Sequence, residues 1–159
     1  GAVYTYNRVK MLTMDPRFYY YKNSMINRNL FDENLVIDCE MNSGSSYEAM
    51  ERYLEKNKKP PKALFISSDA TAAGILKSIR EHGFLVPGDC NIVTYNNTTF
   101  SESSTPPLDS IEVYLKESAK EATFALERFW NAEKLPRKIV IPCSLVIRGS
   151  IKKQENNDK

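Results

Sequence analysis

The sequence predicts an α/β fold with a parallel sheet, and the stretch 63–97 carries this prediction. An apolar run, Ala63 to Ile66, is followed by helix-capping residues and by a periodic segment from Ala70 to His82. Gly83 ends this helix, because glycine adopts a positive φ at little cost. A β-branched and aromatic run, Ile92 to Tyr95, forms the next strand. Strand, helix and strand with short loops make a right-handed βαβ unit.

Polar side chains follow both central strands and predict a ligand site. Ser67 to Asp69 come after the first strand, and Asn96-Asn97 come after the second. Ligands of parallel sheets bind just outside the carboxyl ends of the strands. Hydroxyl and amide groups at this edge suit a neutral polar ligand.

The elements before this unit alternate in the same way. Asp15 or Thr13 can cap a helix whose first turn contains Pro16. Ser45 or Ser46 can cap the helix before the central unit. The sequence therefore predicts a strand at Val3–Tyr6, a helix at Arg17–Asn29, a strand at Asn34–Cys39 and a helix with the apolar stripe Tyr47, Met50, Tyr53 and Leu54.

The elements after the central unit are less regular. Phe100 to Thr105 is expected to be an irregular loop, because it ends at Pro106-Pro107. An extended segment at 108–113 and an unusually apolar helix at 117–131 follow. A returning strand, 138–147, is broken at Pro142, which places it at a sheet edge or at a crossover between lobes.

Composition bounds the class of protein. The chain has 159 residues, a formal net charge of +2, one histidine and three cysteines without a CxxC motif. This pattern predicts one domain with reduced thiols, and it gives no reason to expect a zinc site or a membrane span. The sequence lacks the motifs GxSxG, GxGxxG and HExxH and the P-loop. We therefore expect no enzyme activity, no cofactor and no metal.

A family resemblance joins these pieces. The run ALFISSDATAAGILKSIREHGFLVPGDCNIVTYNNTTFSESSTPPLDSI resembles the effector-binding core of the lactose/galactose-repressor family of bacterial transcription regulators. IVIPCSLVIRGS resembles that family's final strand, and YNNTTF followed by TPPL is similar to its maltose-type repressors. The resemblance covers residues 1–150. It implies a three-layer parallel-sheet sandwich, the C-terminal lobe of a type I periplasmic-binding-protein-like domain.

The resemblance also implies how the chain is divided. Residues 1–112 match the C-terminal effector lobe, 113–136 a crossover helix of the N-terminal lobe, and 137–150 the returning strand, with 151–159 as a polar tail. A helix-turn-helix and the first half of the binding domain are expected to precede residue 1. The crossover helix should therefore show an exposed apolar patch, which a neighbouring copy or crystal contacts would cover.

The resemblance assigns ligand contacts to specific positions. Arg17 matches an arginine that hydrogen-bonds the sugar, and Asn96 matches a position that binds two adjacent hydroxyls. Asparagine in place of the usual aspartate implies a neutral ligand. The remaining matched ligand positions are Thr13, Met41, Ser68 and Asp69.

Simpler structural roles remain open for the same residues. Arg17 can pair with Asp15 on the surface, Asp69 can serve only as a helix N-cap, and the two asparagines at 96–97 can form only a turn. In the family, dimers form through the helix at 70–79 and the loop at 103–107. Ala72, Ala73 and Gly74 would allow close approach there, or they simply face the chain's own sheet. The implied interface residues are Ala72, Ala73, Leu76 and Ser104.

The function implied is the effector-binding domain of a cytoplasmic transcriptional regulator. A small carbohydrate effector would alter the binding of operator DNA by an N-terminal domain, in a homodimer without membrane contact. An exported sugar-binding receptor of the same design is the first alternative, and a small α/β enzyme is the second. The sequence names neither the sugar nor whether it induces or co-represses.

Overall fold

The computed structural model describes residues 2–6, 15–134 and 138–152. Helices and strands alternate through most of this range, as the sequence predicts. The strands are β1 (Ala2–Tyr6), β2 (Val36–Asp38), β3 (Ala63–Ile66), β4 (Asn91–Tyr95), β5 (Asp109–Glu112) and β6 (Ser144–Val146). The helices are α1 (Pro16–Ile26), α2 (Ser43–Asn57), α3 (Asp69–Glu81), α4 (Thr99–Ser103) and α5 (Leu115–Trp130), with a 3₁₀ turn, η1, at Glu33–Leu35.

The strands form one sheet with the order β2-β1-β3-β4-β5-β6. β1 to β5 are parallel, and Phe65 of β3 pairs with Val93 of β4. β6 is antiparallel to β5, so the sheet is mixed and not purely parallel as expected. β6 lies at the sheet edge, as the proline before it predicts, but it begins only after Pro142 and is shorter than the expected strand at 138–147.

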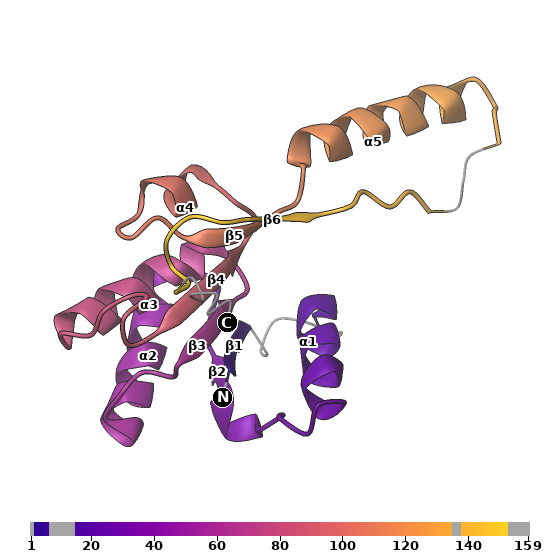
Figure 1. Ribbon diagram of the computed structural model, residues 1–159. Coiled ribbons are helices and arrows are strands. Elements are labelled where there is room, and N and C mark those ends of the chain that lie inside the picture. Colours follow the sequence, from indigo (N-terminus) through magenta and orange to yellow (C-terminus); the bar gives the residue numbers. More distant parts are fainter. Residues whose placement is uncertain (1, 7–14, 135–137, 153–159) are drawn as a thin grey trace, which may run out of the picture.

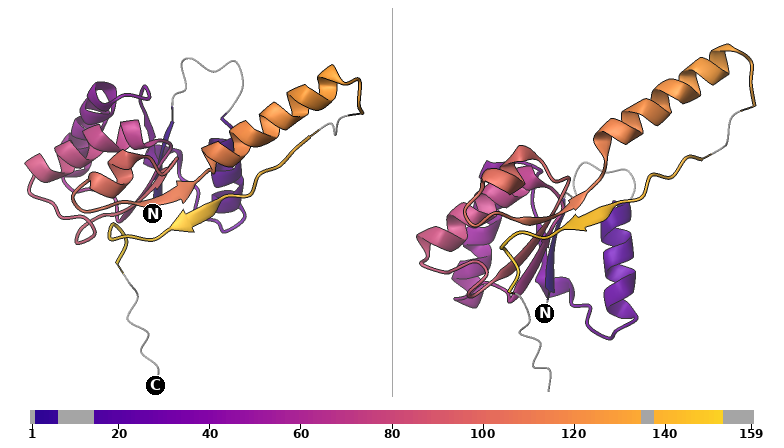
Figure 2. Two further views of the ribbon diagram at one scale, coloured as in Figure 1. Left: turned by 90° about the horizontal axis from the view of Figure 1, so that it is seen from above. Right: turned by 45° about the horizontal axis from the view of Figure 1, so that its top comes forward.

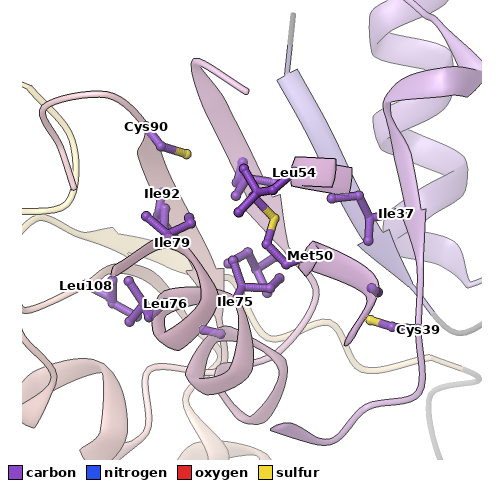
Figure 3. Close-up of a cluster of buried hydrophobic side chains, with 14 residues drawn as sticks. Ile37, Cys39, Met50, Leu54, Ile75, Leu76, Ile79, Cys90, Ile92 and Leu108 are labelled. Carbon is purple, nitrogen blue, oxygen red and sulfur yellow. The ribbon is translucent and has the colours of Figure 1, made fainter. Parts of the chain in front are cut away.

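Helices cover both faces of the sheet and make three layers (Figure 1). Alternation along β3 explains this arrangement: Leu64 and Ile66 join the core beneath α2 and α3, whereas Phe65 packs with Phe18 of α1. Figure 3 shows the larger core, in which side chains of α2 and α3 meet those of the strands. Its members include Ile37, Met50, Leu54, Leu64, Ile66, Ile75, Leu76, Ile79, Ile92 and Leu108.

One helix start and one loop differ from the sequence prediction, and a second helix start decides between the capping residues that the sequence allowed. α2 is capped by Asn42, which accepts from the Ser45 N–H at 2.8 Å, and not by Ser45 or Ser46. Ser68, not Asp69, caps α3. The stretch 100–105, expected as an irregular loop, contains most of α4. That helix is stabilised from outside, because Ser101 is buried and its carbonyl accepts from the Leu108 N–H at 2.7 Å.

Helix α5 projects away from the sheet (Figure 2). None of its residues is buried, and its apolar side chains are largely exposed, with Trp130 at 86%. The expected exposed apolar patch is therefore confirmed. Its exposed members include Leu115, Phe124, Leu126, Phe129 and Trp130.

The cysteines are free thiols, as predicted. Burial raises the pKa of the Cys39 thiol to about 11 and that of the Cys90 thiol to about 12. Because the thiolate is the reactive form, neither side chain is suited to nucleophilic chemistry. Cys143 is exposed.

Helix α2 ends on a residue whose backbone favours glycine. Lys58 has φ 61°, and its N–H donates to the Leu54 carbonyl at 2.7 Å. A non-glycine residue in this conformation costs about 1 kcal/mol. We expect Lys58→Gly to raise the free energy of unfolding by about 0.5–1 kcal/mol in urea denaturation.

Lys56 provides the opposite control for that measurement. It is also an exposed lysine, but it lies inside the last turn of α2. Lys56→Gly should lower the free energy of unfolding by about 1 kcal/mol. Equal losses for the two variants would contradict the strain assigned to Lys58.

Candidate functional site

A pocket of about 410 Å³ lies beside the carboxyl ends of β3 and β4. The parallel register of these strands brings their terminal loops to one edge of the sheet. Four sequence-predicted ligand residues, Met41, Ser68, Asp69 and Asn96, line the pocket together with Ala70, Ala73, Thr98 and Phe100. The carboxyl edge of the sheet, where the sequence predicted a ligand site, therefore contains a pocket.

Asp69 supplies the most informative atom of the pocket. Its side chain is only 3% exposed, and its Oδ2 accepts from the Thr98 N–H and lies 2.7 Å from the Thr98 hydroxyl. Its Oδ1 is buried without a hydrogen-bond partner among the described residues. A buried carboxylate oxygen without a donor is costly, so this atom is suited to accept a hydrogen bond from a ligand.

Ser68 is used mainly by the fold. Its hydroxyl accepts from the Thr71 N–H at 3.3 Å and lies 2.9 Å from the Thr71 hydroxyl. The side chain thus takes the capping role that was considered for Asp69, and it has little capacity left for a ligand. Asp69, freed from capping, holds the Thr98 loop and faces the pocket.

Arg17 is not among the residues that line the pocket, and it is held by neighbouring groups. Its guanidinium donates to both carboxylate oxygens of Asp15 at 2.7–3.1 Å and to the Ser67 carbonyl at 2.6 Å. The same group lies over the Tyr95 ring, 5.2 Å from the ring centre. The pairing with Asp15, left open by the sequence, is therefore present, and a direct contact of Arg17 with a ligand stays a prediction. Thr13 lies outside the described residues.

Asn96 and Asn97 both have a positive φ, 103° and 49°. Asparagine tolerates this region better than most residues, so the pair does form the turn considered from sequence. The two side chains differ, because the amide oxygen and the amide nitrogen of Asn97 each make a hydrogen bond, whereas Asn96 lines the pocket. Asn96 can therefore form the turn with Asn97 and still be available to contact a ligand.

The expected interface residues lie in different places. Ala72 is fully buried in the chain's own core, so its side chain is not available to a second subunit. Leu76 is also a core residue, 3% exposed. It lines, with Ala73 and Ser104, a hollow of about 450 Å³ between α3 and α4, which shares Ala73 and Phe100 with the first pocket. Gly74 does allow a close approach, but the approaching element is α2 of the same chain.

Sequence reasoning missed several residues of the site. Thr98 and Phe100 line the pocket from a stretch expected to be mostly loop, and Asp15 was considered only as a cap or surface partner. The two threonines after Asn97 signal a helix cap and could have indicated α4. Within the described ranges, no group of three or more His, Cys, Asp or Glu side chains is placed to hold a metal ion, and no helix could span a membrane.

Comparisons with known proteins agree with this architecture. A family model described as periplasmic binding protein-like domain matches residues 2–151. The HTH-type transcriptional regulator GalR of Streptococcus thermophilus is 30% identical over 139 residues, 87% of this chain and 42% of that protein. The HTH-type transcriptional repressor MelR of Bacillus subtilis (strain 168) is 32% identical over 115 residues, 72% of this chain and 33% of that protein.

Solved structures share the fold. The transcription regulator CcpA of Lactococcus lactis superposes with a TM-score of 0.83 at 24% identity, over 95% of this chain and 55% of that one. This chain spans less than half the length of the two curated relatives. The chain belongs to the periplasmic binding protein-like domain family, and the two curated relatives that it resembles are HTH-type transcriptional regulators.

Proposed function

We propose that this chain is the effector-binding part of a transcriptional regulator and that it binds a small neutral carbohydrate at the β3–β4 edge. Asp69 lines the pocket, and its carboxylate leaves Oδ1 without a hydrogen-bond partner among the described residues; this observation carries the ligand class. Because no described residue donates a hydrogen bond to this oxygen, the site favours a ligand that carries a hydrogen-bond donor. The two curated relatives described above, both named as HTH-type transcriptional regulators, support the regulatory role.

The rest of the pocket fits a sugar better than an anion. Asn96 offers a donor and an acceptor, which is the combination that adjacent hydroxyls require. Met41, Ala73 and Phe100 provide apolar surface for the C–H faces of a sugar ring. No lysine or arginine is among the described residues that line the pocket, and Arg17 is paired with Asp15. A phosphorylated ligand would therefore lack a counter-charge.

In this proposal the chain supplies one lobe of a two-lobed sensor. Residues 1–112 form the effector lobe, 113–136 cross to the other lobe, 137–150 return, and 151–159 are a tail. The exposed apolar side chains of α5 support this division, because a second lobe would bury them. A ligand held between the lobes would change their closure and thereby the affinity of a DNA-binding domain for its operator.

Dimerisation belongs to the same proposal. Regulators that read paired half-sites are dimers, and the hollow between α3 and α4 offers Ala73 and Ser104 to a second copy. Binding to operator DNA would place the protein in the cytoplasm. The enzyme alternative has no support in the site, because no acid–base pair faces the pocket among its described residues.

Calorimetric titration of the full-length protein with neutral mono- and disaccharides, including maltose, tests the ligand class. We expect one sugar to bind and the phosphorylated form of that sugar to bind at least tenfold more weakly. Asp69→Asn should reduce sugar affinity at least tenfold, because the retained oxygen still accepts from Thr98 while an N–H donor replaces the unpartnered acceptor Oδ1. Asn96→Ala should cause a similar loss.

Glu48→Ala serves as the control for that titration. Glu48 is an exposed residue of α2 and is not part of the pocket lining. This variant should bind the sugar as the parent protein does. The proposal fails if no neutral sugar binds, or if binding survives both Asp69→Asn and Asn96→Ala.

A further inference from the structure

The loop that carries Asn96 is held in an unusual backbone conformation. Asn96 and Asn97 follow one another with φ 103° and 49°, a region that most residues avoid. The Asn96 N–H donates to the Ile111 carbonyl at 3.0 Å, but its side chain has no hydrogen-bond partner among the described residues. Other groups must therefore fix where the Asn96 amide lies in the pocket.

Asn97 makes the contacts that Asn96 lacks. Its Oδ1 accepts from Arg148 Nη2 at 2.7 Å, and its Nδ2 donates to Glu112 Oε2 at 2.6 Å. Its N–H donates to the Ser110 hydroxyl at 3.0 Å. Both ends of the side-chain amide are thus used, and the orientation of the amide is fixed by a donor on one side and an acceptor on the other.

The two partners of Asn97 are themselves anchored to β5. Arg148 Nη1 donates to the Leu108 carbonyl at 2.9 Å, and the Arg148 N–H donates to Asp109 at 3.1 Å. Glu112 Oε1 accepts from the Tyr114 N–H at 2.7 Å. The hydrogen bond from Asn97 is the main cause that lowers the Glu112 pKa, followed by the bond from Tyr114, so the carboxylate form is favoured.

Tyr114 connects this network to helix α5. It has φ 48° and stands at the N-cap of α5, where its own side chain makes no capping hydrogen bond to the helix. Glu112 thus contacts the pocket loop with one oxygen and the start of α5 with the other. A displacement of the loop changes the position of the acceptor that holds the start of the helix.

We infer that Arg148 and Glu112 are positioning residues that act through Asn97 to hold Asn96 in its place in the pocket and to join this loop to the start of α5. The inference rests on the proposed function for its ligand, but the hydrogen-bond network itself is independent of it. Arg148 and Glu112 do not line the pocket. They are expected to change affinity without touching the sugar.

Exchanging the donor and the acceptor of one hydrogen bond tests this inference. Asn97→Asp keeps the acceptor for Arg148 and the tolerance for positive φ, but it sets a carboxylate against Glu112. Glu112→Gln alone leaves one oxygen to serve both Asn97 and Tyr114. In the double variant, the amide introduced at position 112 donates to the carboxylate introduced at position 97, while the oxygen of that amide accepts from the Tyr114 N–H. Both contacts are thereby restored.

Sugar affinity and amide hydrogen exchange of the full-length protein are the two readouts, with maltose and the other neutral sugars as probes. We expect Asn97→Asp to weaken binding at least tenfold, Glu112→Gln to weaken it about threefold, and the double variant to bind within about threefold of the parent. Hydrogen exchange at the Asn96 and Tyr114 amides should be faster in each single variant than in the parent protein. In the double variant, the exchange rates should return to those of the parent. Loss of stability alone would not produce this reciprocal rescue.

The outcomes separate this inference from the proposed function. If no sugar binds the parent protein, the proposed function fails, and rescue of amide exchange still supports the network. The inference is overturned if the double variant has the same weakened sugar affinity and the same fast amide hydrogen exchange as Asn97→Asp. It is also overturned if all three variants match the parent in both readouts.

Discussion

Gly74→Ala is expected to lower the free energy of unfolding by about 2–3 kcal/mol. Gly74 lies where α3 crosses α2, and a Cβ there would meet the Ser43 carbonyl and the Ser46 hydroxyl and would lie 2.7 Å from the Tyr47 nitrogen. Two of these groups are backbone, so they move only if α2 moves as a whole. Separating the helices would loosen the core that both cover, and urea denaturation measures the result.

Gly44→Ala is the matched control for this effect. Gly44 is also a helical glycine, but its Cβ would meet only Asn42 Oδ1 at an ordinary 3.5 Å. Both substitutions gain about 0.5–1 kcal/mol of helix propensity, so the difference between them isolates the steric clash. Gly44→Ala should be neutral or slightly stabilising. Equal stabilities for the two variants would contradict the close packing of α2 against α3.

Asp109→Ala is expected to cost about 4 kcal/mol, the largest loss we predict for a polar residue. Asp109 is 1% exposed, and its carboxylate accepts from the N–H groups of Arg148, Ser150 and Ile151 at 2.7–3.1 Å. The Ser150 hydroxyl lies 2.9 Å from the same carboxylate. Removing the acceptor would leave these donors unpaired at a buried position.

The exposed Asp89 provides the comparison for Asp109. Its carboxylate accepts from the Leu85 N–H at 2.8 Å in a surface turn. Water can replace that acceptor, so Asp89→Ala should cost about 1 kcal/mol or less. Hydrogen exchange should also quicken at 148–151 in Asp109→Ala only. Protection of that segment in Asp109→Ala would show that other contacts hold it.

The order of strands and helices was predictable because it depends on local patterns. A short apolar run predicted β3, a β-branched and aromatic run predicted β4, and Gly83 marked the end of α3. The parallel order predicted a site at the carboxyl edge for Ser68, Asp69 and Asn96, and the family resemblance added Met41. All four residues line one pocket. Helix α4 was missed, because its stability comes from the bond between Leu108 and Ser101 and not from its own five residues.

The roles of individual side chains depended on partners distant in the chain. Sequence alone left Asp69 between a cap and a ligand contact, and the position of Thr98, 29 residues away, decided what its carboxylate binds. The same holds for Asn97, whose partner Arg148 lies 51 residues away. Local propensity thus determined the fold class and the edge where a ligand is expected to bind. Only the tertiary structure decided which polar atoms are satisfied by the fold and which remain for a ligand, because hydrogen bonding joins groups that no local pattern relates.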